Sequence, residues 1–99
     1  MHMNTTITLV VSINAKPECR EQLKVRLLDV AVSTRKEAGN IFYIPHETDD
    51  GTGRFIIYER WADQAALDVH MSQAYLTAFL ADSEAWLSNP IFEIICREM

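Results

Sequence analysis

The side chains best suited to chemistry lie in the stretch RFIIYERWAD, residues 54–63. Glu59 stands two positions before Trp61, so on an extended strand both side chains point to the same face. A carboxylate on an apolar face loses water, and this raises its pKa and suits it to proton abstraction. A glutamate paired with an arginine, or solvated at the end of a strand, would give the same pattern. Both interpretations stay open at this point.

His70 is the second candidate acid or base, on the helix expected to follow this strand. Its imidazole can gain or lose a proton near neutral pH. A lone histidine is also commonly a polar rim residue or a satisfied core residue. The sequence therefore offers two candidate catalytic groups, Glu59 and His70, without choosing between them.

Motifs for metals and nucleotide cofactors are not found in the sequence. His46 and His70 belong to separate elements without paired-ligand spacing, and His46 borders a loop and is expected to be exposed. Gly51 and Gly53 flank a turn and do not open a helix, so they form no phosphate loop. We therefore expect no metal and no nucleotide or flavin cofactor.

The elements that position these residues begin with a strand over 7–13, predicted by alternating apolar residues. Pro17 suits the start of a helix, and apolar residues at helical spacing extend that helix over 18–37. Gly39 is predicted to cap its C-terminus, and Asn40 to adopt left-handed backbone geometry beside it.

Two further strands, 41–46 and 54–63, are separated by a turn with an Asp-Gly step. Asp63 is predicted to cap a short helix, and Ser72 to cap another that carries a wide apolar stripe. A last strand covers 91–97. The order β-α-β-β-α-β predicts an α+β ferredoxin-like sandwich, with an antiparallel sheet and helices on one face.

Bulk composition excludes several classes of protein. A chain of 99 residues makes one domain, residues 1–99. A net charge of −5 argues against nucleic acid and anionic membranes as partners. The two cysteines, Cys19 and Cys96, show no redox or metal spacing and are expected to be buried hydrophobes. With no signal-like or membrane-spanning stretch, we expect a cytoplasmic protein.

The strands are apolar on both faces. The face opposite the helices includes Phe42 and Ile44 of the second strand, Ile56 and Tyr58 of the third, and Phe92 of the last. One chain with two helical regions can cover only one face of a sheet. We therefore expect a homodimer formed through the open face.

The stretches KEAGNIFYIP, RFIIYERWAD and AALDVHMSQAYLTAF together resemble the antibiotic biosynthesis monooxygenase (ABM) family, over about residues 7–97. The family motif is a Glu-x-Gly-Asn turn, an aromatic strand, a strand with Glu and Trp, and a helix with His. The matching residues are Glu37, Ala38, Gly39, Asn40, Tyr43, Phe55, Glu59, Trp61, Ala66 and His70.

The resemblance implies a dimeric α+β barrel and a choice among activities. Some relatives are cofactor-free monooxygenases of anthrones or quinols, and others process sugar-derived signals. In a distant branch that degrades haem, an asparagine on the first strand is required, but Leu9 and Val10 occupy that region here. The Pro-His-aromatic step of signal-processing relatives is replaced by Gln73-Ala74-Tyr75.

We therefore expect a cofactor-independent monooxygenase that uses Glu59 or His70 as its base on a small quinol-like or anthrone-like substrate. A non-oxidative isomerase or signal-processing enzyme, and a non-catalytic binding module, remain alternatives. The aromatic candidates for the substrate wall would fill a core equally well. The predicted substrate-binding residues are Asn40, Tyr43, Trp61, Tyr75 and Phe79.

Overall fold

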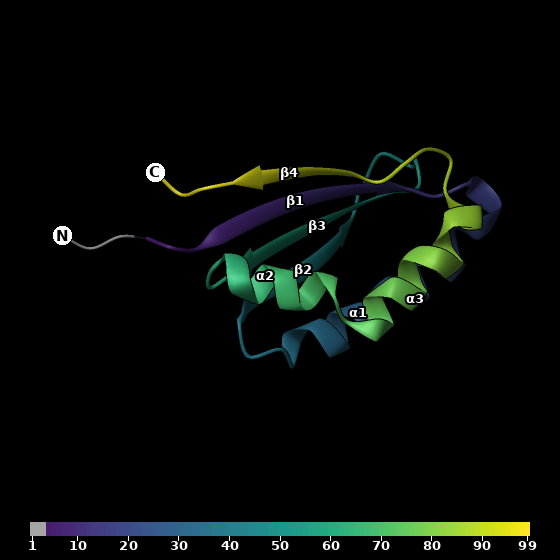
Figure 1. Ribbon diagram of the computed structural model, residues 1–99. Helices are drawn as coiled ribbons and strands as arrows, with labels where there is room; N and C mark the ends of the chain where they lie inside the picture. The colour runs from purple at the N-terminus through teal and green to yellow at the C-terminus, as the bar shows by residue number, and fades with distance from the viewer. Residues whose placement is uncertain (1–3) are drawn as a thin grey trace.

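A computed structural model describes residues 4–99, so the first three residues of the predicted domain lie outside it. Helices cover one face of a four-stranded sheet (Figure 1). The order confirms the predicted α+β ferredoxin-like fold. The elements are β1 (Ile7–Asn14), a 3-10 turn (Pro17–Cys19), α1 (Arg20–Arg35), β2 (Asn40–Glu47), β3 (Arg54–Trp61), α2 (Gln64–Met71), α3 (Ala74–Ser83), a 3-10 turn (Glu84–Trp86) and β4 (Phe92–Cys96).

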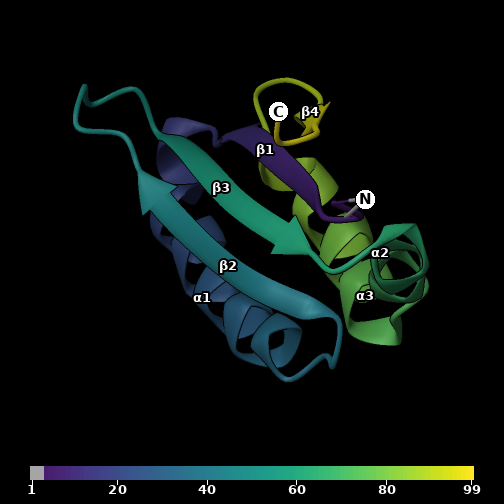
Figure 2. The same ribbon diagram turned by 90° about the vertical axis from the view of Figure 1, so that its left-hand side faces the viewer.

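The strand order is β2-β3-β1-β4, and all neighbouring strands are antiparallel. The candidate base sits in the interior of this sheet, because Glu59 on β3 pairs with Leu9 on β1 and with Tyr43 on β2. Figure 2 shows β3 running between β2 and β1, with the helices behind the sheet. Pairing with both neighbouring strands therefore fixes the position of Glu59 relative to β1 and β2.

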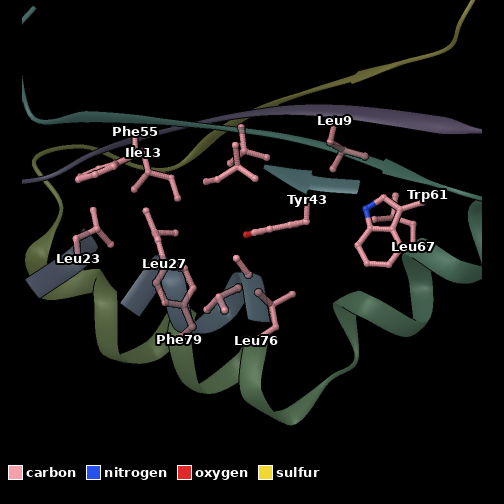
Figure 3. Packing of buried hydrophobic residues seen from close by; sticks show 14 of the residues in the cluster. Leu9, Ile13, Leu23, Leu27, Tyr43, Phe55, Trp61, Leu67, Leu76 and Phe79 are labelled. Atoms are coloured by element: carbon pink, nitrogen blue, oxygen red, sulfur yellow. The ribbon is translucent and has the colours of Figure 1, made fainter. Parts of the chain in front are cut away.

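The core lies between the sheet and the helices (Figure 3). Every second residue of β3 is buried on this side, as the alternating pattern predicts. The predicted stripe of the first helix is also buried at Leu23, Leu27, Val30, Ala31 and Thr34.

Two predicted helix caps are wrong, at Gly39 and Ser72. The first helix ends at Arg35 with right-handed Lys36 as its cap, and only Gly51 and Gly53 have positive φ within residues 4–99, so Asn40 is not left-handed either. Gly39 is instead required by close packing: a Cβ there would lie 2.2 Å from the Cβ of Ala66. A glycine soon after a helix is also the sequence pattern of a C-terminal cap, and the chain does change direction between α1 and β2.

At the second break, Ser72 ends α2 instead of starting α3, and its hydroxyl donates to the Val69 carbonyl at 2.8 Å. The helix α3 begins after Gln73, whose side chain makes no capping bond. The predicted Asp63 cap of α2 is confirmed, because its carboxylate accepts from the Ala66 amide at 2.8 Å. A side-chain cap thus anchors the helix that carries His70.

The face of the sheet away from the helices is apolar, as its sequence pattern predicts. Within the single chain, Ile44 and Tyr58 are each 41% exposed, Ile94 48% and Phe92 62%. Val10 of β1 pairs with both Tyr58 and Ile94, and Tyr58 pairs with Ile44, so one apolar row crosses all four strands.

Candidate functional site

The Glu59 carboxylate and the Trp61 indole lie side by side and are hydrogen-bonded. Glu59 is 4% exposed and Trp61 is fully buried, both on the helix-covered face of β3. The indole Nε1–H donates to Glu59 Oε1 at 2.9 Å. Trp61 therefore orients one carboxylate oxygen and leaves Oε2 for another partner.

Burial controls the ionisation of this carboxyl. Loss of water raises the pKa of Glu59 from its ordinary 4.5 to about 7. This value is the net result, in which the bond from Trp61 lowers the pKa while the carboxylates of Glu93 and Glu37 raise it by less than burial does. At neutral pH both forms of Glu59 are populated, which suits a group that accepts and then returns a proton.

This shift predicts a pH-dependent stability. The folded state holds the Glu59 proton up to about pH 7, whereas the unfolded state releases it near 4.5, so folding binds protons between these values. The contribution is fully present below the unfolded pKa and is lost as pH rises through 7. We expect the free energy of unfolding to fall by up to about 3 kcal/mol from this group across that window.

Urea denaturation between about pH 5 and pH 8 checks this expectation. Glu59→Gln removes the titration, so the variant should gain stability relative to the native protein as pH rises. A difference between the two proteins that stays constant with pH would contradict the burial of an ionisable Glu59.

His70 is held by contacts on two sides. The residue is 3% exposed, and its Nδ1 lies 2.7 Å from Glu37 Oε2. Its ring stacks on Trp61 with centroids 4.4 Å apart and planes tilted by 34°. The two candidate bases are thus linked through Trp61, which bonds to Glu59 and stacks on His70.

Glu37 contacts His70 through a hydrogen bond that the sequence did not predict. It follows α1, and its carboxylate also accepts from Tyr75 Oη and from Gln73 Nε2, the latter at 3.3 Å. Thr34 Oγ1 lies 3.0 Å from the same Tyr75 hydroxyl. The family motif contains Glu37, but its spacing of 33 residues from His70 gives no local signal of the contact.

A small cavity of about 70 Å³ lies between the sheet and α3. Both candidate bases reach its wall, and so do Tyr43 and Phe79 among the predicted substrate-binding residues. Figure 3 shows the Tyr43 ring in the layer between sheet and helices. The lining residues are Leu9, Val11, Ile13, Tyr43, Ile57, Glu59, His70, Met71, Leu76, Phe79, Leu80, Ile91 and Glu93.

The cavity wall is apolar apart from a few groups. The carboxylates of Glu59 and Glu93 are its acidic groups, and no lysine or arginine lines it among residues 4–99. Burial and then the charge of Glu59 raise the pKa of Tyr43 far above its usual range, so its phenol stays neutral. The cavity therefore favours an uncharged ring-bearing molecule over an anion.

The other predicted binding residues lie outside this wall. Trp61 is behind Glu59 and His70, and Tyr75 belongs to the Glu37 cluster. Asn40 donates from Nδ2 to the carbonyls of Phe42 at 3.0 Å and Arg60 at 3.4 Å, across an irregularity in the β2–β3 pairing. Its amide therefore stabilises the strand pairing.

The part of the chain that the structure describes contains neither a metal cluster nor a membrane-spanning helix. No three His, Cys, Asp or Glu side chains come together there as a metal site. None of the helices of residues 4–99 is long and apolar enough to cross a membrane.

Known proteins resemble this chain in sequence and in structure. The protein named "Putative monooxygenase YcnE" of Bacillus subtilis is 32% identical over 86% of this chain and 90% of its own length. The structure of PA3566 from Pseudomonas aeruginosa is 30% identical, with a TM-score of 0.91 over 100% of this chain and 99% of its own. That of Rv0793 from Mycobacterium tuberculosis has a TM-score of 0.90 at 23% identity, over 95% of each chain.

The family model described as antibiotic biosynthesis monooxygenase matches residues 6–93. This range contains β1, all three α-helices and the whole of the cluster around Glu59, His70 and Glu37. The chain belongs to the antibiotic biosynthesis monooxygenase family.

Proposed function

We propose that this protein is a cofactor-independent monooxygenase of a small, uncharged quinol-like or anthrone-like substrate. The observation that carries the proposal is Glu59, a buried carboxylate with a pKa of about 7 on the wall of an apolar cavity. A base of this strength removes a proton from an acidic O–H or C–H near neutral pH. Membership of the family supports oxygenase chemistry in general.

The reaction balances without a further reductant. Glu59 or His70 takes the substrate proton, and the electron pair stays on the substrate as an anion conjugated with the ring. That anion transfers one electron to O₂, and the two radicals combine as a peroxide. Loss of water then leaves a carbonyl, so one oxygen atom enters the product and the other enters water.

The remaining side chains have supporting roles in this proposal. Tyr43, as a neutral phenol, donates a hydrogen bond to a substrate oxygen, and Phe79 stacks against a ring. Trp61 acts through Glu59 by orienting its carboxylate. Asn40 and Tyr75 do not line the cavity. Asn40 stabilises the strand pairing, and Tyr75 donates a hydrogen bond to Glu37.

The size of the cavity limits what enters it. A volume of about 70 Å³ is below the roughly 150 Å³ of an engineered cavity that holds benzene. Two lining side chains, Met71 at 50% and Leu80 at 40% exposed, form part of the wall toward solvent. Their movement would admit a ring, so we expect one-ring quinols to bind more readily than three-ring anthrones.

The same base would also serve a non-oxidative isomerase, which is the alternative activity. A phosphorylated sugar is disfavoured as its substrate, because no lysine or arginine lines the cavity within residues 4–99. A neutral isomerase substrate and a non-catalytic binding module remain to be tested against the oxygenase.

Assembly and location complete the proposal. The exposed apolar face that contains Ile44, Tyr58, Phe92 and Ile94 supports a homodimer, because burying it removes apolar surface from water. Cys19 and Cys96 are both unpaired, which supports the reducing cytoplasm as its compartment.

Oxygen uptake by purified protein tests the function, with quinols of one ring and anthrones of three and with no added metal or flavin. We expect uptake above the autoxidation of each substrate, in step with carbonyl formation. Product formation that continues without O₂ would favour the isomerase. Ligand-induced stabilisation without any product would favour the binding module.

A further inference from the structure

The cluster around Glu37 joins three separate segments of the chain. Glu37 comes from the turn after α1, His70 from α2, and Tyr75 from α3. The side chains of His70 and Glu37 are only 4% and 9% exposed. A carboxylate this deeply buried needs hydrogen-bond donors, and the residues around it supply them.

All the groups that contact the Glu37 carboxylate can donate. The amide of Gln73 donates to Oε1, the Tyr75 hydroxyl donates to Oε2, and His70 Nδ1 lies 2.7 Å from Oε2. Ionised carboxylate oxygens can only accept hydrogen bonds. With Glu37 as the acceptor, the imidazole carries a proton on Nδ1.

This assignment determines the other nitrogen of the ring. In neutral His70 the Nδ1–H form leaves a lone pair on Nε2, and among residues 4–99 no protein group bonds to Nε2. The ring itself lines the cavity. A free imidazole in water favours the opposite form, with its proton on Nε2, so the protein selects the rarer one.

We propose that Glu37 is a positioning residue that holds neutral His70 as the Nδ1–H tautomer and presents the Nε2 lone pair to the cavity. This rests on the proposed function in one respect, that the cavity is where a substrate proton is transferred. When His70 acts as the base, the substrate proton passes to Nε2, its bonding electrons remain on the substrate, and the resulting imidazolium is paired with the Glu37 carboxylate.

Other contacts hold both Glu37 and His70 in place. Because Glu37 is anchored by Gln73 and by Tyr75, it cannot turn away from His70 without breaking other bonds. Trp61 stacks on the ring and restricts its rotation. Removing carboxylates that orient metal-bound histidines lowers metal affinity or activity by about 10- to 100-fold, and we expect an effect of that order on activity here.

Nitrogen-15 NMR of histidine-labelled protein tests the assignment directly, at a pH where His70 is neutral. We expect Nδ1 of His70 to show the protonated signature and Nε2 the unprotonated one. His46, which is exposed, supplies an internal reference for the ordinary form. A native His70 with its proton on Nε2 would overturn the proposal.

Variants separate positioning from simple stabilisation. Glu37→Leu keeps similar volume without an acceptor, and we expect the tautomer ratio of His70 to shift at least tenfold toward Nε2–H. Glu47→Gln is the matched control, since Glu47 is a partly exposed carboxylate paired with Arg20 and Lys24, and it should leave the ratio unchanged. An unchanged ratio in folded Glu37→Leu would overturn the proposal.

The two proposals can fail separately. Native protein that shows the Nδ1–H tautomer but consumes no oxygen with any substrate would refute the proposed oxygenase and support the role of Glu37. Oxygen uptake by a protein whose His70 carries its proton on Nε2 would refute the role of Glu37 and support the oxygenase.

Discussion

Glu59→Gln is expected to lower the rate of oxygen uptake by about 10²- to 10⁴-fold, the usual contribution of a positioned general base. The glutamine fills the same volume, and its carbonyl oxygen can still accept from the Trp61 indole. It has no basic oxygen, so proton removal is lost while the pocket is kept. Initial rates of oxygen consumption at saturating substrate measure the effect.

The dependence of the rate on pH also has a predicted direction. A base must be ionised to act, so the native rate should fall as pH drops below about 7, where Glu59 becomes protonated. Glu93→Gln is the matched control, because Glu93 lies on the same wall and raises the pKa of Glu59. It should move the profile to lower pH and change the maximal rate only a few fold.

His70→Ala decides between the two candidate bases. Loss of activity in this variant with full activity in Glu59→Gln would make His70 the base. Full activity in both variants, on a substrate that the native protein oxidises, would refute base-assisted oxidation at this cavity.

Gly39→Ala is expected to have the largest effect on stability, a loss of about 2 to 3 kcal/mol, as overpacking of a rigid contact produces. The new Cβ would lie 2.2 Å from the Cβ of Ala66 and 3.3 Å from its Cα, so no flexible side chain can move aside. The melting temperature should fall by roughly 10 to 20 °C for a domain of this size. Calorimetry or circular dichroism measures it.

The reciprocal variant tests the cause of this loss. Ala66→Gly alone should cost about 1 kcal/mol through helix propensity in α2. Combined with Gly39→Ala it should restore part of the stability, since the two methyl groups no longer overlap. A double variant as unstable as the sum of the single variants would show that the contact is not the reason for glycine.

Local patterns predicted the parts of the site that depend on one element. Alternation along β3 predicted that Glu59 and Trp61 share one face, because the period of a strand is fixed by its backbone, and the structure buries that face. The cap at Asp63 was also predictable, since its acceptor and the Ala66 amide are three residues apart.

Other features were misread because two causes give the same local pattern. A glycine after a helix signals a left-handed cap, yet Gly39 is explained by Ala66, which lies far along the chain. Ser72 has the chemistry of an N-cap but ends α2, because the chain turns one residue later than the pattern suggests.

The sequence by itself determined the fold class, the strand that carries Glu59 and the helix that carries His70, since these follow from periodicity and local capping. The tertiary structure alone decided that Trp61 stacks on His70 and that Glu37 holds His70. It also separated Tyr43 and Phe79, on the cavity wall, from Tyr75, behind it. Contacts between distant residues depend on how whole elements pack, and no local spacing contains that information.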